Sequence, residues 1–412
     1  MNILLIHQNF VDPTHAGGTR HFELMSFWAR HGHKTTMITG TVDYLTGQRI
    51  EGTRGWVTEQ WLDDIRVLRA YTLPTLHTSF NHRVVAFCSF MISAIFAGFW
   101  AGPVDVVIGT SPPIFQLVSA WLIAVFKRKP FVLEIRDLWP EFAIEIGVLK
   151  NPLLIWLSRS LERFMYARAN HIVVNSPAFR GYLLEKGIRA SRISVVPNGV
   201  DPDMFQPEAD GERFRKDLGL ANQFIATYAG ALGMANDIST ILRAAARLRE
   251  NDSVHFLLVG AGKEADNLRA EAESLRLTNV TFAGTYPKNR MNEVLAGSDA
   301  CLATLKDIRM FRTVYPNKVF DYMAAGRPVV LGIGGVIRDV VEDAQAGIAF
   351  EPGNDEQLAK AILKLAGDRV ASSEMGAHGR SYVVENFHRG HHANHFMRII
   401  QEQANPRREN GN

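Results

Sequence analysis

The sequence predicts an α/β protein with two doubly wound parallel-sheet domains that face each other across a cleft. The chain has 412 residues, which is too long for one ordinary hydrophobic core. Short apolar segments alternate with segments of helical periodicity, as in sheets whose strands are joined by crossover helices. The alternation starts again after a junction rich in proline and glycine at residues 197–222. Ligands of such sheets bind beyond the carboxyl ends of the strands, so the cleft is the expected site.

The first half begins with a strand over residues 3–7 and a loop that ends in Gly17 and Gly18. A helix is expected over residues 19–31, with apolar side chains on one face. Further strands are expected at residues 33–39, 105–110, 131–135 and 171–175. These strands are short and almost wholly apolar, which indicates a parallel sheet buried on both faces.

The second half repeats the order of strand, glycine-containing loop and helix. The strand covers residues 224–229, the loop 230–234 and the helix about 237–250. Four more strands are expected at residues 254–259, 280–282, 300–304 and 329–332. This repetition indicates a second domain of the same class.

The domain boundaries follow from the junction. We expect an N-terminal domain over residues 1–200 and a C-terminal domain over residues 201–385. Residues 386–412 are expected to form a C-terminal helix and a polar tail that could pack back on the N-terminal domain. The pattern does not place the last helices, near residues 370–403.

Composition narrows the class of protein. Residues 1–200 carry 20 basic and 14 acidic residues, whereas the rest of the chain carries 25 and 28. A mildly basic first half suits a phosphate or an anionic lipid, and no nucleic-acid motif or dense basic tract is present, so we expect no nucleic-acid partner. Two cysteines far apart indicate a reducing compartment. The chain enters a strand directly, so no signal peptide is expected.

Residues 84–104 contain no charged side chain and are long enough to span a bilayer. Three interpretations are open: a buried core helix, a transmembrane span, or a helix that touches the membrane surface or lines an apolar acceptor groove. We favour the last, because a span would separate residues 1–83 from the rest of one sheet. Arg83 and Trp100 at the ends of the segment fit an interface position.

The segment 316–330, PNKVFDYMAAGRPVV, predicts a site for a nucleotide diphosphate and its ribose. It indicates a short helix with Lys318 and Asp321 near its start, followed by a buried strand. A helix N-terminus attracts phosphate, Lys318 adds charge, and Asp321 can hold ribose hydroxyls. Gly326 as a helix C-cap before a core strand is the alternative explanation, but it does not require Lys318 and Asp321 together.

Two segments of the first half add polar groups. Gly17 and Gly18 precede a helix and let backbone N–H groups approach an anion, with Arg20 in the first turn. The segment 134–141, EIRDLWPE, follows a buried strand, so its side chains emerge at the strand's carboxyl end. It brings Arg136, Asp137 and Glu141 next to Trp139, a side chain that often stacks on sugars. An internal ion pair of Arg136 with Asp137 or Glu134 is the alternative.

These segments together resemble the retaining glycosyltransferases of family 4, which have the GT-B fold. The resemblance covers the Gly17–Gly18 loop, the 134–141 segment, the Pro-Asn-Gly-Val-Asp turn at 197–201 and the segment 316–330, in family order. The 134–141 segment is similar to that of enzymes that build bacterial surface polysaccharides, such as the fucosamine transferases. Gly230 and Gly233 match a family turn that contacts the donor.

The chain departs from the family pattern in three places. Arg136 and Asp137 stand where other members often place a histidine, so a histidine-based role is not carried over. The Arg and Lys that follow the Gly230 turn in many members are absent, which leaves the phosphate charge to Lys318 and Lys263. Thr313 stands at the first position of the family's paired acidic motif, where a Glu is usual.

The resemblance implies transfer of a hexose or N-acetylamino sugar from a nucleotide-diphosphate donor, with UDP favoured, and with retention of configuration. Lys318 and Asp137 would be catalytic, since charge on the departing diphosphate must be stabilised and two substrates oriented. The donor would be held by the residues Gly17, Gly18, Gly230, Lys263, Asn317, Lys318 and Asp321. The acceptor would be oriented by Arg20, Arg136, Trp139 and Glu141.

No metal and no further cofactor is expected beside the nucleotide-sugar, because the histidines near the C-terminus lack metal-ligand spacing. The acceptor is expected to be a lipid-linked saccharide of O-antigen or capsule synthesis, reached from the cytoplasm at the inner membrane, with residues 84–104 touching the lipid. Two alternatives stay open: a nucleotide-sugar epimerase of the same fold and a non-catalytic binding subunit.

Overall fold

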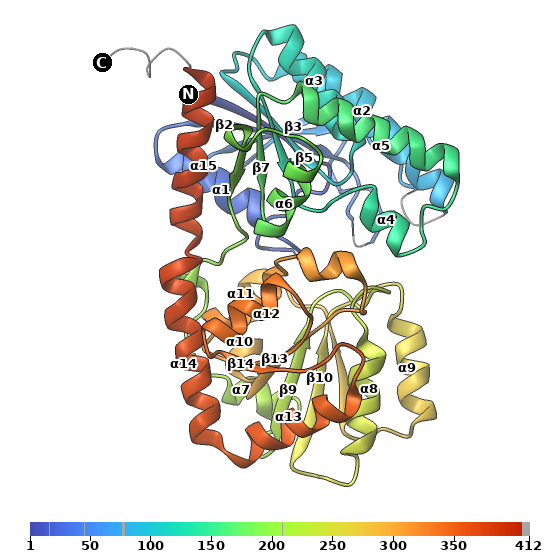
Figure 1. Ribbon diagram of the computed structural model, residues 1–412, viewed down its shortest axis with the longest axis vertical. Helices are drawn as coiled ribbons and strands as arrows, with labels where there is room; N and C mark the ends of the chain where they lie inside the picture. Colours follow the sequence, from blue (N-terminus) through green and yellow to red (C-terminus); the bar gives the residue numbers. More distant parts are fainter. Residues whose placement is uncertain (16, 45, 76–78, 208, 406–412) are drawn as a thin grey trace. The chain divides into compact units, whose positions relative to one another are not determined.

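A computed structural model describes residues 1–15, 17–44, 46–75, 79–207 and 209–405. The chain divides into two compact units (Figure 1). The first unit comprises Met1–Asp12, Thr19–Pro197 and Gly390–Asn412. The second unit comprises Pro13–Gly18 and Asn198–Arg389, so the Gly17–Gly18 loop is grouped with the second half of the chain.

The first unit contains an eight-stranded sheet in the order β3-β4-β2-β1-β5-β6-β7-β8. All neighbours are parallel except β3 and β4. The strands are β1 (Asn2–Ile6), β2 (Lys34–Gly40), β3 (Val57–Leu62), β4 (Ile65–Ala70), β5 (Val106–Ser111), β6 (Phe131–Ile135), β7 (His171–Val174) and β8 (Ile193–Val195). The helices are α1 (Arg20–Arg30), α2 (Phe80–Trp100), α3 (Phe115–Lys127), α4 (Glu141–Glu145), α5 (Pro152–Arg168), α6 (Pro177–Glu185) and α15 (Arg389–Ala404).

Helices cover both faces of this sheet. One face packs on α1 and α15, where Trp28 is fully buried against Phe396 and its indole N–H donates to the carbonyl of Ala393 at 3.0 Å. The other face is covered by α2 and α3. Gly109 of β5 lets α3 approach, because a Cβ there would lie 2.6 Å from that of Ala120. The C-terminal helix is thus part of the core of the first unit.

Helix α2 contains most of the charge-free segment, and only one side of it is buried. Phe90, Ala94 and Ala97 are fully buried, and the hydroxyl of Ser93 donates to the carbonyl of Tyr71 at 2.6 Å. By length and composition alone, Asn81–Trp100 could cross a membrane, although a third of its most apolar window is buried in the protein. The helix therefore packs on the sheet with one side and exposes apolar side chains on the other.

The second unit contains a six-stranded sheet, all parallel, in the order β11-β10-β9-β12-β13-β14. The strands are β9 (Phe224–Ala229), β10 (Val254–Val259), β11 (Val280–Gly284), β12 (Ala300–Thr304), β13 (Val329–Gly332) and β14 (Gly347–Ala349). The helices are α7 (Glu212–Asp217), α8 (Ile238–Arg247), α9 (Ala265–Ser274), α10 (Met291–Ala296), α11 (Asn317–Ala324), α12 (Val336–Asp343), α13 (Asp355–Gly367) and α14 (Arg369–Asn386). Short 3₁₀ turns occur at Ala190–Arg192, Pro202–Met204, Lys288–Arg290 and Arg309–Thr313.

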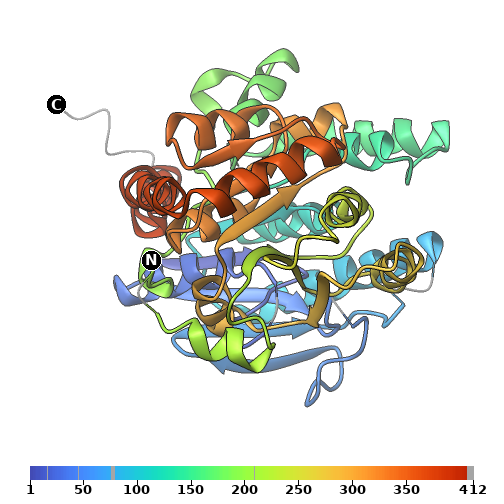
Figure 2. The same ribbon diagram turned by 90° about the horizontal axis from the view of Figure 1, so that it is seen from below.

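Alternate side chains of the second sheet enter two cores. Ile225, Leu257 and Cys301 belong to the core that contains α11 and α12. Phe224, Phe256 and Ala300 belong to the core on the opposite face, which contains α8 and α13 (Figure 1; Figure 2). Successive side chains of a strand point to opposite faces, so a sheet with two apolar faces must be covered by helices on both.

The predicted order of strands and helices is confirmed, with β9, β10, β12 and β13 at the predicted bounds. The strands β3, β4, β8 and β14 were not predicted from the sequence. The pair β3 and β4 is an edge hairpin that turns at Asp63 in the left-handed region and alternates polar with apolar residues, so it lacks the apolar run used to find strands. The predicted helix at 237–250 ends earlier, at Arg247.

Both sheets reverse their strand order at one point. In the first unit β1 lies between β2 and β5, and in the second β9 lies between β10 and β12. The carboxyl ends of strands next to such a reversal form the usual ligand crevice of doubly wound sheets. His7 follows β1, and Gly230 follows β9.

Candidate active site

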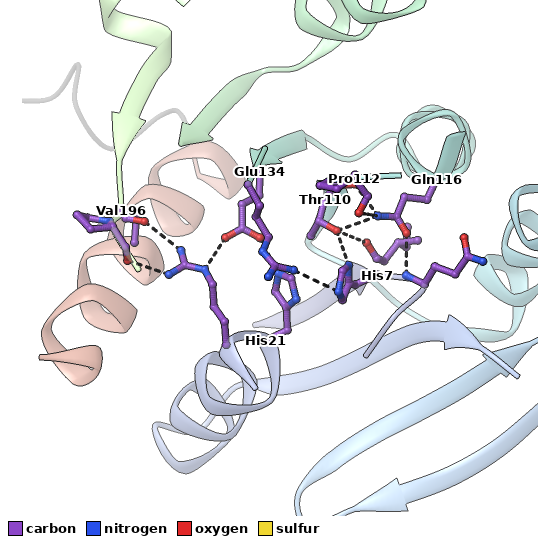
Figure 3. A network of polar contacts seen from close by, with 12 residues as sticks. His7, His21, Thr110, Pro112, Gln116, Glu134 and Val196 are labelled. Carbon is purple, nitrogen blue, oxygen red and sulfur yellow. Dashed lines mark hydrogen bonds and ion pairs between the residues drawn. The ribbon is translucent and has the colours of Figure 1, made fainter. Parts of the chain in front are cut away.

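A buried polar cluster lies at the carboxyl ends of β1, β5 and β6 in the first unit (Figure 3). At its centre, Glu134 of β6 has a fully buried side chain. Its carboxylate accepts from Arg20 Nε at 3.0 Å and from His21 Nε2 at 2.7 Å, both at the start of α1. Arg20 also donates to the carbonyls of Val196 at 3.0 Å and Pro197 at 2.8 Å.

The protonation states of this cluster follow from burial and neighbouring charge. Burial opposes ionisation of Glu134, but Arg20 and His21 hold the pKa of Glu134 well below its usual range. Burial lowers the pKa of His21 to about 4, against the opposing pull of Glu134. His21 is therefore neutral near pH 7 and donates its Nε2–H to an ionised carboxylate.

His7 connects this cluster to Arg136. Its Nδ1 lies 2.8 Å from Thr110 Oγ1, and its Nε2 lies 3.3 Å from Arg136 Nη1. Burial, with the nearby His21 and Arg136, holds the pKa of His7 well below its usual range. A neutral His7 accepts from Arg136 at Nε2, so Nδ1 carries the proton that it donates to Thr110.

Gln116, at the start of α3, is hydrogen-bonded to Thr110. Its amide N–H₂ donates to the Thr110 carbonyl at 2.7 Å and hydroxyl at 3.0 Å, and its Oε1 accepts from the Gln8 amide at 2.7 Å. The Arg136 guanidinium is thereby held from one side. Its buried Nε has no acceptor among the residues that the structure describes, which leaves a donor for a ligand.

Asp137 is half-buried next to this cluster. Burial raises its pKa to about 6, although the charge of Arg136 opposes this. Within the described ranges, no hydrogen bond or ion pair reaches its carboxylate, so neither ion pair of Arg136 that the sequence left open forms. Perturbed, unpaired carboxylates at the carboxyl edge of a sheet are typical of functional sites.

The other residues expected on the acceptor side have structural partners. Trp139 is half-buried, with its ring 6.3 Å from that of Phe115. Glu141, at the start of α4, accepts two hydrogen bonds of 2.9 Å from Arg159 of α5. Arg20 is fully buried by the contacts given above. Glu141 and Arg20 therefore have visible structural tasks, and their roles toward an acceptor stay predictions.

In the second unit, Lys318 lies near the start of α11 against the loop that follows β9. Its Nζ donates to Tyr228 Oη at 2.6 Å and to Asn236 Oδ1 at 3.3 Å. A Cβ on Gly230, whose φ is +157°, would lie 2.8 Å from this Nζ, so only a glycine leaves room for it. Burial lowers the pKa of Lys318 to about 7. No carboxylate neutralises Lys318 in the described part of the chain.

Asp321, one turn further along α11, is paired with a lysine. Lys288 Nζ donates to its Oδ2 at 2.5 Å, and both side chains are mostly buried. Lys288 also lies over the ring of Phe205, 5.0 Å from its centroid. The next residue, Asn289, donates its backbone N–H to the carbonyl of Pro13 at 3.2 Å, so the 288–290 turn contacts both Asp321 and the start of the glycine loop.

The remaining predicted donor residues lie around these elements. Asn317 begins α11, and its buried Oδ1 has no donor among the described residues. Lys263 is exposed, on a turn packed so closely that a Cβ on Gly262 would lie 2.2 Å from the Leu232 carbonyl oxygen. Gly17 and Gly18 are exposed, with φ of +143° at Gly17. The structure thus brings Gly230 and Lys318 into contact, whereas the Lys263 side chain has no partner among the described residues.

Four residues that contact the predicted site residues or their neighbours were not predicted from the sequence: His7, His21, Tyr228 and Lys288. His7 and Tyr228 had a usable signal, since one follows a strand and the other precedes the Gly230 turn. His21 and Lys288 had none, because their carboxylate partners are 113 and 33 residues away. In the part of the chain that the structure describes, no three His, Cys, Asp or Glu side chains are grouped to hold a metal ion.

Two family models match the chain. Residues 17–199 match the glycosyl transferase 4-like domain, and residues 223–368 match the domain described as glycosyl transferases group 1. The chain is 25% identical to the probable glycosyltransferase WbjE of Pseudomonas aeruginosa, over 69% of this chain and 71% of that protein. It is 24% identical to the putative colanic acid biosynthesis glycosyl transferase WcaI of Escherichia coli K12, over 80% and 83%.

Solved structures show the same fold. Sucrose-phosphate synthase from Thermosynechococcus elongatus superimposes with a TM-score of 0.79 at 19% identity, over 97% of this chain and 98% of that chain. Anabaena Alr3699/HepE in complex with UDP-glucose superimposes with a TM-score of 0.73 at 18% identity, over 98% and 100%. The predicted GT-B fold is therefore confirmed.

Proposed function

Because this chain is a glycosyltransferase with the GT-B fold, we propose that it transfers a sugar from a UDP-sugar to a lipid-linked saccharide, with retention of configuration, during the synthesis of a bacterial surface polysaccharide. The observation that carries the proposal is the environment of the Lys318 ammonium group. Its ammonium group lies against Gly230 at the sheet's switch point, with no carboxylate partner among the described residues. Such a cation needs an anion, and the donor diphosphate supplies one.

Lys318 binds the departing phosphate in this proposal. With a pKa of about 7, Lys318 is only partly protonated in the free enzyme. A diphosphate next to it favours the charged form, so donor binding and protonation support each other. Tyr228 and Asn236 hold the ammonium group in place before the donor arrives. Asn317, at the first turn of α11, adds backbone N–H groups to the same phosphate.

Asp321 binds the ribose hydroxyls. The carboxylate is held at Oδ2 by Lys288, and its other oxygen accepts no hydrogen bond from a described residue. An ionised, oriented carboxylate is a good acceptor for the vicinal hydroxyls of a ribose. Gly17, Gly18, Gly230 and Lys263 supply backbone donors and charge around the phosphates and the sugar.

In the reaction, the bond between the sugar's anomeric carbon and the diphosphate oxygen breaks, and a bond to the acceptor hydroxyl oxygen forms on the same face. The acceptor proton passes to the departing phosphate oxygen, and UDP leaves. Lys318 stabilises the charge that develops on this oxygen. Asp137 and Arg136, with Trp139 beside them, orient the acceptor. Arg20 and Glu141 contribute indirectly: Arg20 is hydrogen-bonded to Glu134, and Glu141 is hydrogen-bonded to Arg159.

Two lines of support concern the substrates. The similar HepE structures contain UDP, UDP-glucose or UDP with glucose, which favours a UDP donor here. The relative WcaI is named for colanic acid biosynthesis, and the similar WaaG structure for lipopolysaccharide biosynthesis, which favours a surface saccharide as acceptor. We propose that this saccharide is carried by a lipid and that the enzyme works on the cytoplasmic face of the inner membrane, with residues 84–104 touching the lipid.

A thermal-shift screen tests the donor assignment, because a ligand that binds only the folded state raises Tm. UDP and UDP-sugars should raise Tm more than GDP, ADP or TDP at equal concentration, and Lys318→Ala should remove the shift. A shift with GDP or TDP alone would replace UDP by that nucleotide. No shift with any nucleotide at millimolar concentration would reject the donor site.

A further inference from the structure

We propose that the outward sides of α2, α3 and α5 form one surface that docks on bilayers containing anionic lipids. This inference rests on the proposed lipid-linked acceptor, and it adds two helices and a lipid class to the apolar segment 84–104. We call this surface the three-helix face and define it by Phe99, Trp100, Phe126, Leu153, Trp156 and Leu157.

Large apolar side chains of the three-helix face are exposed. Phe99 of α2 is 58% exposed, Phe126 of α3 is 60% exposed and Trp156 of α5 is 59% exposed. Isolated apolar side chains on a surface are ordinary, but a continuous set on neighbouring helices marks a place for a partner or a membrane.

The three helices are continuous in space. Helix α3 contacts both α2 and α5 (Figure 1). The rings of Phe99 and Phe126 lie 5.9 Å apart, and those of Trp121 and Phe164 lie 5.0 Å apart, edge to face. These contacts join α2 to α3 and α3 to α5. The helices that carry the exposed apolar side chains are therefore packed side by side.

Helix α2 lies along this face and does not cross a bilayer in this fold. Its inward residues are fixed to the sheet, because Phe90 and Ala94 are fully buried and Ser93 donates to the Tyr71 carbonyl. A span would have to release these contacts. A helix that keeps one side on the protein can insert its other side only to the depth of the lipid headgroups and first methylenes.

The exposed charges of α5 favour lipids with anionic headgroups. Its one carboxylate, Glu162, is buried and accepts hydrogen bonds from Lys186 and from Tyr182. The exposed charged side chains of α5 are therefore the arginines at positions 159, 163 and 168. The charge of Arg159 is offset by Glu141, but Arg163 has no partner among the described residues, and Arg168 lies over the rings of Trp121 and Phe164. Arginines beside exposed Trp and Leu are typical of helices at anionic membrane surfaces.

A second copy of the chain fits the three-helix face less well than an anionic bilayer does. Two copies that met through this face would bring the same arginines together, and like charges in an interface oppose association. The C-terminal end of α3 adds Lys127 and Arg128. Anionic headgroups complement this charge, and the acyl region accepts the apolar side chains.

The test is flotation of the full-length protein with vesicles of phosphatidylcholine alone and of phosphatidylcholine with phosphatidylglycerol. The wild type should float with the anionic vesicles. Leu153→Glu with Trp156→Glu should weaken this binding roughly tenfold or more, since each side chain leaves the apolar phase and adds a negative charge. Arg163→Glu with Arg128→Glu should also weaken it, and added salt should weaken wild-type binding.

Leu363→Glu with Val370→Glu is the matched control. Both side chains are exposed and apolar but lie on α13 and α14 of the second unit, so this variant should float as the wild type does. Equal flotation of the α5 variant and the wild type would overturn the proposal. So would a wild-type dimer in solution that the α5 variant converts to a monomer, because a second copy would then cover the face.

The Tm shift with UDP separates this inference from the proposed function. The α5 variant should keep the UDP shift, which would show that its fold and donor site are intact. Flotation without any nucleotide shift in the wild type would reject the donor site and leave the docking surface standing. A Tm shift with UDP but no flotation of the wild type would reject the docking surface and leave the donor site standing.

Discussion

Lys288 Nζ donates to Asp321 Oδ2 at 2.5 Å, so a lysine from the turn before α10 holds the carboxylate expected to bind ribose. Both groups are mostly buried, and Phe205 packs against the lysine. An ion pair shielded from water is stronger than one at the surface and fixes a rotamer. The lysine therefore fixes the orientation of the Asp321 side chain.

We expect Lys288→Met to raise the Kd for the donor about tenfold, because the Asp321 side chain loses its fixed orientation. Lys288→Arg should restore part of the affinity, and kcat should change little. Isothermal titration with UDP measures the affinity. Equal affinity in wild type and Lys288→Met would show that the pair is irrelevant to the donor.

We expect Lys318→Ala to lower the transfer rate by at least about 100-fold, since the charge on the departing diphosphate loses its counter-ion. The fold should remain intact, with far-UV circular dichroism as the check. Lys216→Ala, which removes an exposed lysine from α7, is the control and should be fully active. An unchanged rate in Lys318→Ala would remove Lys318 from the mechanism.

The affinity for UDP should depend on pH through Lys318. In the free enzyme its pKa is about 7, and the bound diphosphate raises it. Affinity should therefore fall as pH rises above 7, by up to about tenfold per pH unit. UDP binding at pH 7.5 should take up protons, which titrations in buffers of different ionisation enthalpy measure. A rise in affinity above pH 7 would contradict this assignment.

We expect Asp137→Asn to reduce transfer about 100-fold and to leave the Tm shift with UDP unchanged, because Asp137 belongs to the first unit and is assigned to the acceptor. The wild-type kcat/KM for the acceptor should rise with pH through about 6, where the carboxylate ionises. That rise should be missing in the residual activity of Asp137→Asn. Loss of UDP binding in this variant would move Asp137 to the donor side.

The first unit should lose stability in mild acid. His21 has a folded-state pKa of about 4, below that of the unfolded chain, so the unfolded state binds more protons between those two values. Stability should therefore fall as pH drops from about 6.5 to about 4, by up to about 3 kcal/mol from this residue. Urea unfolding of the wild type at pH 7.5 and pH 5 measures the loss, and His21→Gln should show a smaller one.

Glu134→Gln should destabilise the first unit by about 3–5 kcal/mol, because it removes the buried carboxylate that pairs with Arg20. Unfolding in urea at pH 7.5 measures this. Glu141→Gln removes a carboxylate from a largely exposed pair with Arg159 and should cost less than about 1 kcal/mol. Equal losses in the two variants would contradict the buried role of Glu134.

Local patterns predicted much of this molecule. The apolar runs of β9, β10, β12 and β13 gave their bounds directly, and the segment 316–330 gave the helix that carries Lys318 and Asp321. The β3–β4 hairpin was not predicted because its edge strand is half polar. The C-terminal helix was expected to be able to pack back on the first domain, but its place beside α1 could not be predicted, because its partner Trp28 lies more than 360 residues earlier.

By itself the sequence determined the class of fold and, through its motifs, the enzyme class. It also showed that Lys318 lies at the start of a helix and that Asp137 follows a strand, because periodicity and turn chemistry act over a few residues. Tertiary structure alone decided which charges meet. Glu134 pairs with Arg20 and not with its neighbour Arg136, Asp321 pairs with Lys288, and Lys318 has no carboxylate partner among the described residues. Charges and hydrogen bonds act through space, and the crossover connections bring together carboxyl strand ends that the chain separates by a hundred residues.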